Sequence, residues 1–406
     1  MSHRPRLIVP ALCAAEILSM AAFAMFPALQ PVLRAEWALS NTAAGWIAGT
    51  YYFGYMLAVP LLTGLTDRVD PKRVWLASAA LVWGAAILFG AAADGLPSAL
   101  ACQFLAGVGL AGTFMPGLKL LADATEGPLQ ARFISFYTTS FTVGSSASFY
   151  VLGALADAYG WRPAVLGAAI GPALGWLIVL MTLPGHASRG FAWTALRTMD
   201  FRPVVRSPAT MRYMYSYVGH MWELFSFRAW LVPFLTFTYA LHARPGALRP
   251  TTVAALISLL GVPSSILGNE LSTRFGRPRV ITIVMASSLA MSVAAGFSAP
   301  MPWAVVVLAC CVYGVMINAD SAALTSGLIA SARFEVRGAS MALYSMLGFA
   351  GAFTGSLAVG GVLDALGGQS AGSWATAFIA MGLPGISGLF IMRRAAAAAR
   401  TACYSG

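Results

Sequence analysis

Three acidic residues lie within apolar stretches that are long enough to cross a lipid bilayer. Glu16, Glu223 and Asp320 differ in this respect from the other eleven of the 14 acidic residues, which fall in loops or near the ends of apolar runs. A charge near the centre of a bilayer costs about 2.5–3.5 kcal/mol on insertion scales, so each residue is a functional candidate. A buried carboxyl group can bind and release a proton, and we expect Glu16, Glu223 or both to do so.

Other polar residues accompany these acids. His220 precedes Glu223 by three positions and shares its helical face, where it can tune or relay a proton. Arg228 follows five positions after Glu223 and points elsewhere, so it can bind an anionic group of a ligand or a neighbouring acid. Asn318 adds a polar stripe beside Asp320. The alternative interpretation is a static polar network that holds helices together.

The sequence predicts no metal site and no cofactor. The five cysteines follow no metal-binding or redox spacing, and only one of the four histidines, His220, lies in the middle of an apolar run. The 18 methionines lack a ligand spacing that would indicate a copper carrier.

The composition excludes most soluble classes of protein. Of the 406 residues, 59% are hydrophobic and only 10% are charged. A soluble domain has about 25% charged residues. A soluble enzyme, a nucleic-acid-binding protein and a disordered protein are therefore not expected. The net charge of +11 indicates instead a basic cytoplasmic membrane face.

Apolar runs separated by charges, glycines and prolines predict an all-α integral membrane protein with twelve spans. We place these spans at 7–34, 42–65, 73–93, 97–122, 131–156, 161–184, 212–239, 248–271, 279–298, 302–329, 338–363 and 373–392. They form two six-helix bundles, 1–184 and 211–406, which a basic linker at 185–210 connects.

The basic residues predict the orientation in the membrane. Twenty of the 25 lysines and arginines fall in one set of loops, tails and adjoining helix ends, four fall in the other set, and Arg228 lies inside a span. The positive-inside rule then places both termini in the cytoplasm. We expect a multi-pass protein of the inner (cytoplasmic) membrane.

The two halves of the sequence repeat each other at an offset of 205 to 207 residues. Four matches lie at equivalent places in successive spans: Glu16 to Ser19 with Glu223 to Ser226, Arg68 and Val74 with Arg274 and Val280, Arg132 and Ser135 with Arg337 and Ser340, and Gly153, Asp157 and Gly160 with Gly360, Asp364 and Gly367. A duplicated six-span unit is typical of transporters.

The loop between the second and third spans carries a recognisable motif at 63–73. It resembles the pattern Gly-x-Leu-Ala-Asp-Arg-x-Gly-Arg-Lys of the major facilitator superfamily, which Leu65, Asp67, Arg68 and Lys72 fit. Thr63, Asp70 and Pro71 depart from it. The second copy, at 269–277, keeps a glycine and basic residues. Together with the twelve spans and the repeat, the resemblance covers the whole chain.

The resemblance implies a fold and a set of roles. In that family, spans one, four, seven and ten line a central cavity, and the three buried acids fall on spans one, seven and ten. The loop residues Asp67, Arg68, Lys72 and Arg73 would form a clasp that gates one face, or would simply set the topology. Gln103 stands where span four often has an arginine, and residues 144–147 lack the Gly-Pro pair common in drug antiporters.

We therefore expect a secondary active transporter that moves a small polar or anionic organic solute by alternating access, driven by the proton gradient. An anionic solute is inferred from Arg228 alone. The protein would work as a monomer in the lipid bilayer, without enzymatic activity and without nucleic acid. The main alternative is a proton-coupled efflux carrier of drugs or metabolites. A metal carrier, a channel and an intramembrane enzyme are less favoured.

Overall fold

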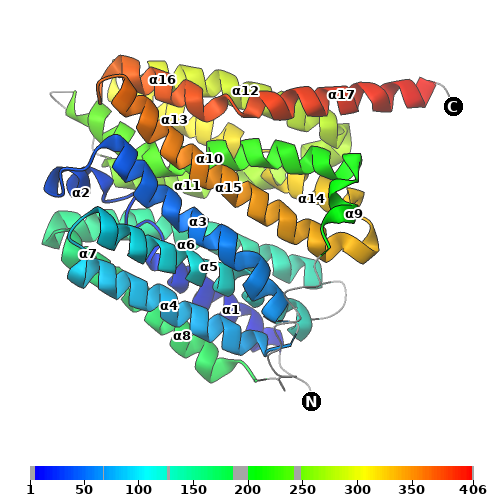
Figure 1. Cartoon of the computed structure of the whole chain (residues 1–406), viewed down its shortest axis with the longest axis horizontal. Coiled ribbons are helices and arrows are strands. Elements are labelled where there is room, and N and C mark those ends of the chain that lie inside the picture. The colour runs from blue at the N-terminus through cyan, green and yellow to red at the C-terminus, as the bar shows by residue number, and fades with distance from the viewer. Residues whose placement is uncertain (1–4, 67, 126–128, 186–199, 242–247, 405–406) are drawn as a thin grey trace. The chain divides into compact units, whose positions relative to one another are not determined.

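The computed structural model describes residues 5–66, 68–125, 129–185, 200–241 and 248–404, and every regular element in these ranges is a helix (Figure 1). The first half comprises α1 (Pro5–Ser19), η1 (Met20–Ala22), α2 (Gln30–Glu36), α3 (Asn41–Leu65), α4 (Pro71–Ala92), α5 (Leu96–Ala124), α6 (Gln130–Tyr159), α7 (Trp161–Ala168) and α8 (Ile170–Thr182). The second half comprises α9 (Arg202–Val205), α10 (Pro208–Ala240), α11 (Pro250–Phe275), α12 (Arg277–Phe297), α13 (Trp303–Asn318), α14 (Ser321–Ser331), η3 (Phe334–Val336), α15 (Arg337–Ala365), α16 (Ala371–Gly382) and α17 (Gly385–Tyr404).

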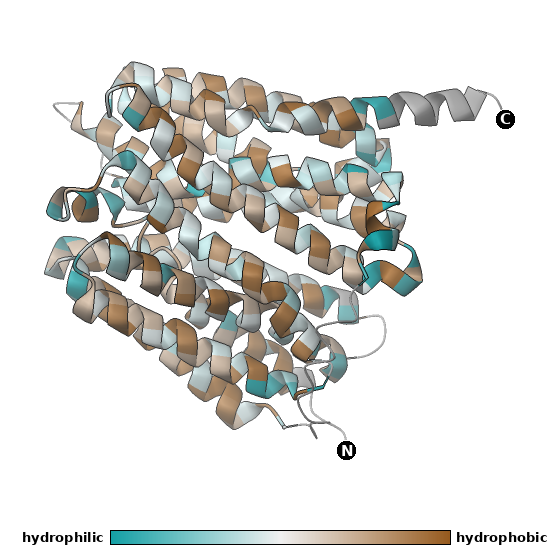
Figure 2. Cartoon of the chain, viewed as in Figure 1, coloured by the Kyte–Doolittle hydropathy of each residue, from teal (hydrophilic) through white to brown (hydrophobic). Residues whose placement is uncertain are grey.

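Each of the twelve predicted spans coincides with one helix or with helices in series, which agrees with the expected all-helical membrane fold. Within the described ranges, eight spans are long and apolar enough to cross a bilayer. The other four predicted spans, those of α1, α3, α6 and α10, are shorter or more polar. Figure 2 shows hydrophobic residues along the helices and hydrophilic residues gathered mainly at helix ends and turns.

Four of the twelve spans consist of more than one helix in series. Spans one, six, ten and twelve are broken into α1 and α2, α7 and α8, α13 and α14, and α16 and α17. In span twelve, Pro384 lies in the break, where it removes a backbone donor.

The chain divides into two compact units. The first contains residues 1–39 and 50–199, and the second contains 40–49 and 200–406. Helix α3 therefore contributes its first turns to the second unit and its remainder to the first. Most of the predicted linker at 185–210 lies outside the described residues, and the predicted domain limits stay a prediction.

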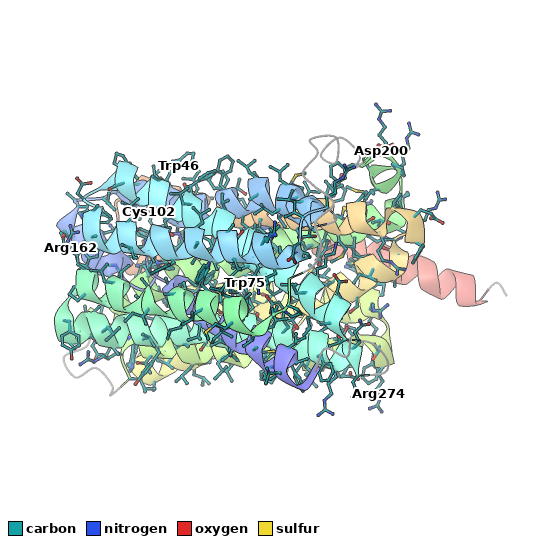
Figure 3. All side chains as sticks on the ribbon, turned by 90° about the horizontal axis from the view of Figure 1, so that it is seen from below. Trp46, Trp75, Cys102, Arg162, Asp200 and Arg274 are labelled. Atoms are coloured by element: carbon teal, nitrogen blue, oxygen red, sulfur yellow. The ribbon has the colours of Figure 1, made fainter. Side chains whose placement is uncertain are left out.

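The first unit is built around bulky side chains that are fully enclosed by its helices. Trp75 of α4 and Tyr137 of α6 have no exposed surface and pack with Leu12 of α1 and Leu121 of α5. Figure 3 shows Trp75 amid the helices of this unit, whereas Arg162 lies at one end of it. There the Arg162 guanidinium donates to the carbonyl groups of Gly90 and Ala93, which end α4.

Helix α1 ends in the middle of its span, and a serine from α6 satisfies the backbone there. The hydroxyl group of Ser148 accepts a hydrogen bond from the Ala24 amide at 2.9 Å and donates one to the Ala21 carbonyl at 2.7 Å. Inside a bilayer such groups have no water to bond. The break at residues 23–29 is therefore stabilised by contact with α6.

In the second unit, a serine from a neighbouring helix likewise bonds to the backbone at the break between α13 and α14. Ala319 donates its amide to the Met316 carbonyl, which leaves the Val315 carbonyl to accept from the Ser264 hydroxyl of α11. Gly268 lets α11 approach the break, because an added Cβ would overlap the Ala319 carbonyl oxygen. The break is thus held by two residues of one neighbouring helix.

A carboxylate caps the first turn of α3 within the second unit. Asp364, at the end of α15, accepts hydrogen bonds from the Asn41 amide at 3.0 Å, the Asn41 side chain at 2.8 Å and the Thr42 amide at 2.7 Å. Helix N-termini favour negative charge and leave amide groups that need acceptors. Asp364 therefore ties residues 40–49 to α15.

We predict that Gly268→Val lowers the thermal unfolding midpoint of the purified protein in detergent micelles. The larger side chain pushes α11 away from the Ala319 carbonyl, at a cost of about 1–3 kcal/mol typical of overpacking. Gly361→Ala in α15 is the control, because an added Cβ there meets no atom within 4 Å. An unchanged midpoint for Gly268→Val would contradict the tight contact at the break.

We also predict that Asp364→Ala destabilises the protein by about 1–2 kcal/mol through loss of the cap on α3. Glu335→Ala is the comparison, because Glu335 pairs only with an exposed Arg333 at 3.7 Å and should change stability by less than about 1 kcal/mol. Equal unfolding midpoints for the two variants would argue against the capping role.

Candidate functional site

Glu16 lies fully enclosed in the first unit. Its side chain has no exposed surface, and its Oε2 accepts a hydrogen bond of 2.9 Å from the Tyr137 hydroxyl. Its Oε1 has no hydrogen-bond partner among the described residues. Helix α1 supplies the carboxyl group and α6 supplies the tyrosine. A carboxyl group with one donor and no basic neighbour at bonding distance in the described chain is suited to bind a proton.

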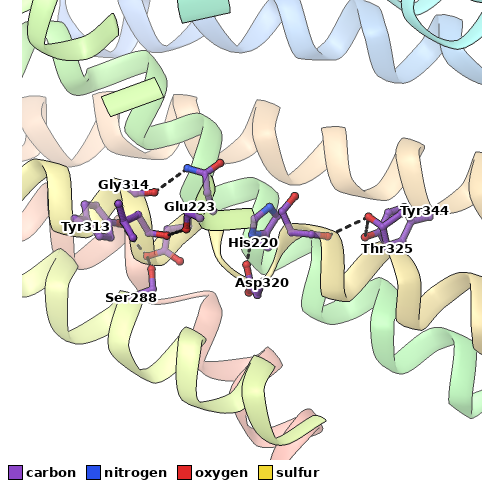
Figure 4. A network of polar contacts seen from close by, with 12 residues as sticks. His220, Glu223, Ser288, Tyr313, Gly314, Asp320, Thr325 and Tyr344 are labelled. Carbon is purple, nitrogen blue, oxygen red and sulfur yellow. Dashed lines mark hydrogen bonds and ion pairs between the residues drawn. The ribbon is translucent and has the colours of Figure 1, made fainter. Parts of the chain in front are cut away.

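Glu223 lies in a denser polar network in the second unit (Figure 4). Its Oε1 accepts hydrogen bonds from Ser288 of α12 at 2.7 Å and from Tyr313 of α13 at 3.0 Å. The side chain is buried in the middle of α10. Glu16 and Glu223 are equivalent in the sequence repeat, and each accepts from a tyrosine hydroxyl. Among the described residues, one side chain donates to Glu16 and two donate to Glu223.

His220 contacts Asp320 rather than Glu223. Its Nδ1 lies 2.8 Å from the Asp320 carboxylate, and both side chains are almost completely buried. Asp320 is the N-cap residue directly before α14, at the break in span ten. Its carboxylate is directed to the histidine and does not cap α14. The imidazole Nε2 has no hydrogen-bond partner among the described residues.

Arg228 and Asn318 have different surroundings. Arg228 is buried, and its guanidinium lies 5.5 Å from the ring centre of Phe225 on the same helix. Asn318 is half-buried and donates to the Gly314 carbonyl at 2.8 Å. Asn318 therefore stabilises the last turn of α13 directly before the break.

The predicted gating loop is described only in part. Asp67 lies outside the described residues, Arg68 is half-buried, and Arg73 is exposed. The Lys72 ammonium group donates to the Leu180 carbonyl at 2.9 Å and to the Leu183 carbonyl. Lys72 thus binds the end of α8, where a positive charge is favourable.

A second lysine makes a similar contact. The Lys119 side chain of α5 donates to the Thr66 carbonyl at 2.9 Å, at the end of α3. Both lysines therefore join helix ends within the first unit. These contacts show that the two lysines connect neighbouring helices. That the loop gates a pathway stays a prediction.

The residues that donate to the acids lie far from them in the sequence and were not among the predicted site residues. Tyr137, Tyr313 and Ser288 contact the two glutamates, although they stand 121, 90 and 65 residues away in the sequence. Tyr313 had a weak signal, because it shares a helical face with Asp320. In the described part of the chain, no group of three or more His, Cys, Asp or Glu side chains could hold a metal ion.

Comparisons with known proteins agree with this architecture. The model of the Major Facilitator Superfamily matches residues 12–356. The niacin transporter NiaP of Acinetobacter baylyi is 28% identical over 153 residues, which are 37% of this chain and only 34% of that protein. The probable sulfoacetate transporter SauU of Cupriavidus necator is 26% identical over 309 residues, 68% of this chain and 69% of that protein.

The fold also matches a solved structure. The nucleoside transporter NupG superposes with a TM-score of 0.74 at 14% identity, over 95% of this chain and 98% of that one. At this identity the likeness shows the fold alone. The family model, however, covers most of the sequence, and the chain therefore belongs to the major facilitator superfamily of membrane transporters.

Proposed function

We propose that the protein is a proton-coupled secondary transporter that carries a small organic anion across the inner membrane by alternating access. The observation that carries this proposal is the pair of buried carboxyl groups at repeat-equivalent positions, Glu16 and Glu223, each bonded to a tyrosine hydroxyl. The distribution of basic residues supports cytoplasmic termini.

Proton coupling follows from the cost of burying charge. In the described chain, neither Glu16 nor Glu223 has a lysine or arginine at ion-pair distance, and hydroxyl groups are their hydrogen-bond donors. A carboxylate without a positive partner is costly away from water. Each acid therefore holds a proton while it is enclosed, and releases the proton when an opening of the protein brings water to it.

His220 and Asp320 extend the proton site in the second unit. The carboxylate lies against Nδ1 and so fixes the orientation of the ring, as in other carboxylate–histidine pairs. Because this pair lies one helical turn from Glu223 along α10, its charges act electrostatically on the Glu223 carboxyl group.

An anionic substrate is supported by Arg228 and by the relatives. Arg228 is a permanently charged side chain buried in α10, the helix that also carries His220 and Glu223. Niacin and sulfoacetate, the compounds named for two relatives, both carry an acidic group that is ionised at neutral pH. We propose that Arg228 binds such a group directly.

The proton role predicts loss of substrate-driven proton flux when the carboxyl groups are removed. Proteoliposomes that contain a pH-sensitive dye are given nicotinate and then sulfoacetate, and the internal pH is followed. We expect wild type to show an anion-dependent pH change. In Glu16→Gln and in Glu223→Gln, this pH change should be smaller by at least about tenfold. Glu270→Gln, at an exposed acid of α11, is the control. Undiminished flux in both glutamine variants would refute the proton role.

The substrate role of Arg228 has its own test. Arg228→Gln should reduce saturable uptake of the transported anion by at least about 30-fold, the effect of removing a buried charged partner. Arg228→Lys keeps the charge and should retain part of the uptake. The neutral solute adenosine is tested beside the anions. Preferred transport of adenosine would favour a different substrate. Outward transport only would favour the efflux alternative.

A further inference from the structure

The hydroxyl group of Tyr137 lies between two acceptors on different helices. Its oxygen is 2.9 Å from Glu16 Oε2 on α1 and 3.2 Å from the Thr113 carbonyl oxygen on α5. All three side chains have 1% or less of their surface exposed. A hydroxyl group has one proton, so Tyr137 can donate fully to only one of these acceptors at a time.

We propose that Tyr137 is a positioning residue that transmits the protonation state of Glu16 to helix α5, an inference that rests on the proposed proton binding at Glu16. When Glu16 is a carboxylate, the Tyr137 O–H donates to Oε2, because hydrogen bonds to charged acceptors are stronger. When Glu16 gains a proton, its own O–H donates to the tyrosine oxygen. The Tyr137 O–H then turns to the Thr113 carbonyl. One proton is added at Glu16, and tyrosine keeps its own.

Helix α5 is weakened at the turn that this hydroxyl contacts. Pro116 has no amide hydrogen, so the Gly112 carbonyl one turn earlier lacks its helical donor. Gly117 provides the space for the hydroxyl, because an added Cβ would overlap the Tyr137 oxygen. A hydrogen bond gained or lost at Thr113 therefore acts on the turn that Pro116 weakens, where a helix bends at low cost.

A cavity adjoins this turn in the first unit. It is small, and Thr113 lines it together with Leu110, Ser19 and Tyr51. Movement of α5 at Thr113 thus changes the wall of the cavity. Proton binding at Glu16 would reach the cavity although Glu16 is not among the residues that line it.

Few other titratable groups face Glu16. Cys13 lies on the same helix, Tyr51 projects from α3, and α8 carries no titratable residue. The charged residues of the helices packed against α1 stand near the helix ends: Lys72, Arg73, Lys119, Asp123, Arg132 and Asp157. Tyr137 is therefore the titratable residue that bonds directly to the carboxyl group.

The sequence repeat supplies a matched control. Tyr344 is equivalent to Tyr137 at an offset of 207 residues, and it is buried in the second unit. Its hydroxyl is 3.1 Å from the hydroxyl of Thr325, and no carboxylate among the described residues is hydrogen-bonded to it. Tyr344→Phe removes the same atom from a buried tyrosine without touching Glu16.

The test is a pH titration of the purified protein by infrared difference spectroscopy, which needs no substrate. Glu16→Gln identifies the band of protonated Glu16 by its absence. In Tyr137→Phe the charged form of Glu16 loses its donor, so the midpoint of this band should shift to higher pH by about one unit. Tyr344→Phe should leave it unchanged. In wild type, the tyrosine C–O band should shift at the same pH as the Glu16 band. In Glu16→Gln, this shift of the tyrosine band should be absent.

A second variant allows the same test if Tyr137→Phe does not fold. Gly117→Ala keeps the Tyr137 hydroxyl but displaces it, and should give a shift in the same direction as Tyr137→Phe. The inference would be overturned by an unshifted Glu16 midpoint in both variants. It would also be overturned by a wild-type tyrosine C–O band that does not change with pH. If instead no pH-dependent carboxyl band disappears in Glu16→Gln, the proton role of Glu16 fails, and the proposed function fails with it.

Discussion

The whole structure depends on one constraint: inside the bilayer-spanning helices, polar groups must find their partners within the protein. Backbone groups freed by the breaks in spans one and ten bond to Ser148 and Ser264, which reach in from α6 and α11. The buried acids meet the constraint through hydroxyl groups and a histidine instead of lysine or arginine. Such partners stabilise a carboxylate incompletely, and the proposed proton exchange rests on this incomplete compensation.

Most of the fold follows from local sequence, because a bilayer restricts the chain to long apolar helices. The twelve apolar runs therefore predicted the positions of the helices. The breaks in spans one and ten could not be predicted in the same way. Residues 23–29 are apolar and include Pro27, which interrupts a helix locally. Their irregular backbone is, however, stabilised by Ser148, which lies more than 120 residues further along the chain. Local periodicity carries no information about such a partner.

The candidate site was predicted in its acids but not in its contacts. The cost of charge in a membrane identified Glu16, Glu223 and Asp320 from sequence alone. Helical spacing placed His220 beside Glu223, whereas the structure places it against Asp320 at the start of α14. An interval of three residues brings two side chains to one helical face, but the partner that each contacts is decided by the helices packed against that face.

The repeat explains where the two halves agree and where they diverge. Glu16 and Glu223 are equivalent, yet Glu16 accepts from Tyr137 of α6 and Glu223 accepts from Tyr313 of α13, whereas the tyrosine equivalent to Tyr137 bonds to Thr325. The two halves thus share the acid but differ in its donors. Glu223 has two donors, while Glu16 has one donor that is shared with the Thr113 carbonyl. A shared donor can change its acceptor when the charge of one acceptor changes, whereas each donor of Glu223 bonds to the carboxylate itself. If both acids bind protons as proposed, the proton at Glu16 should therefore alter the surrounding helices more than the proton at Glu223.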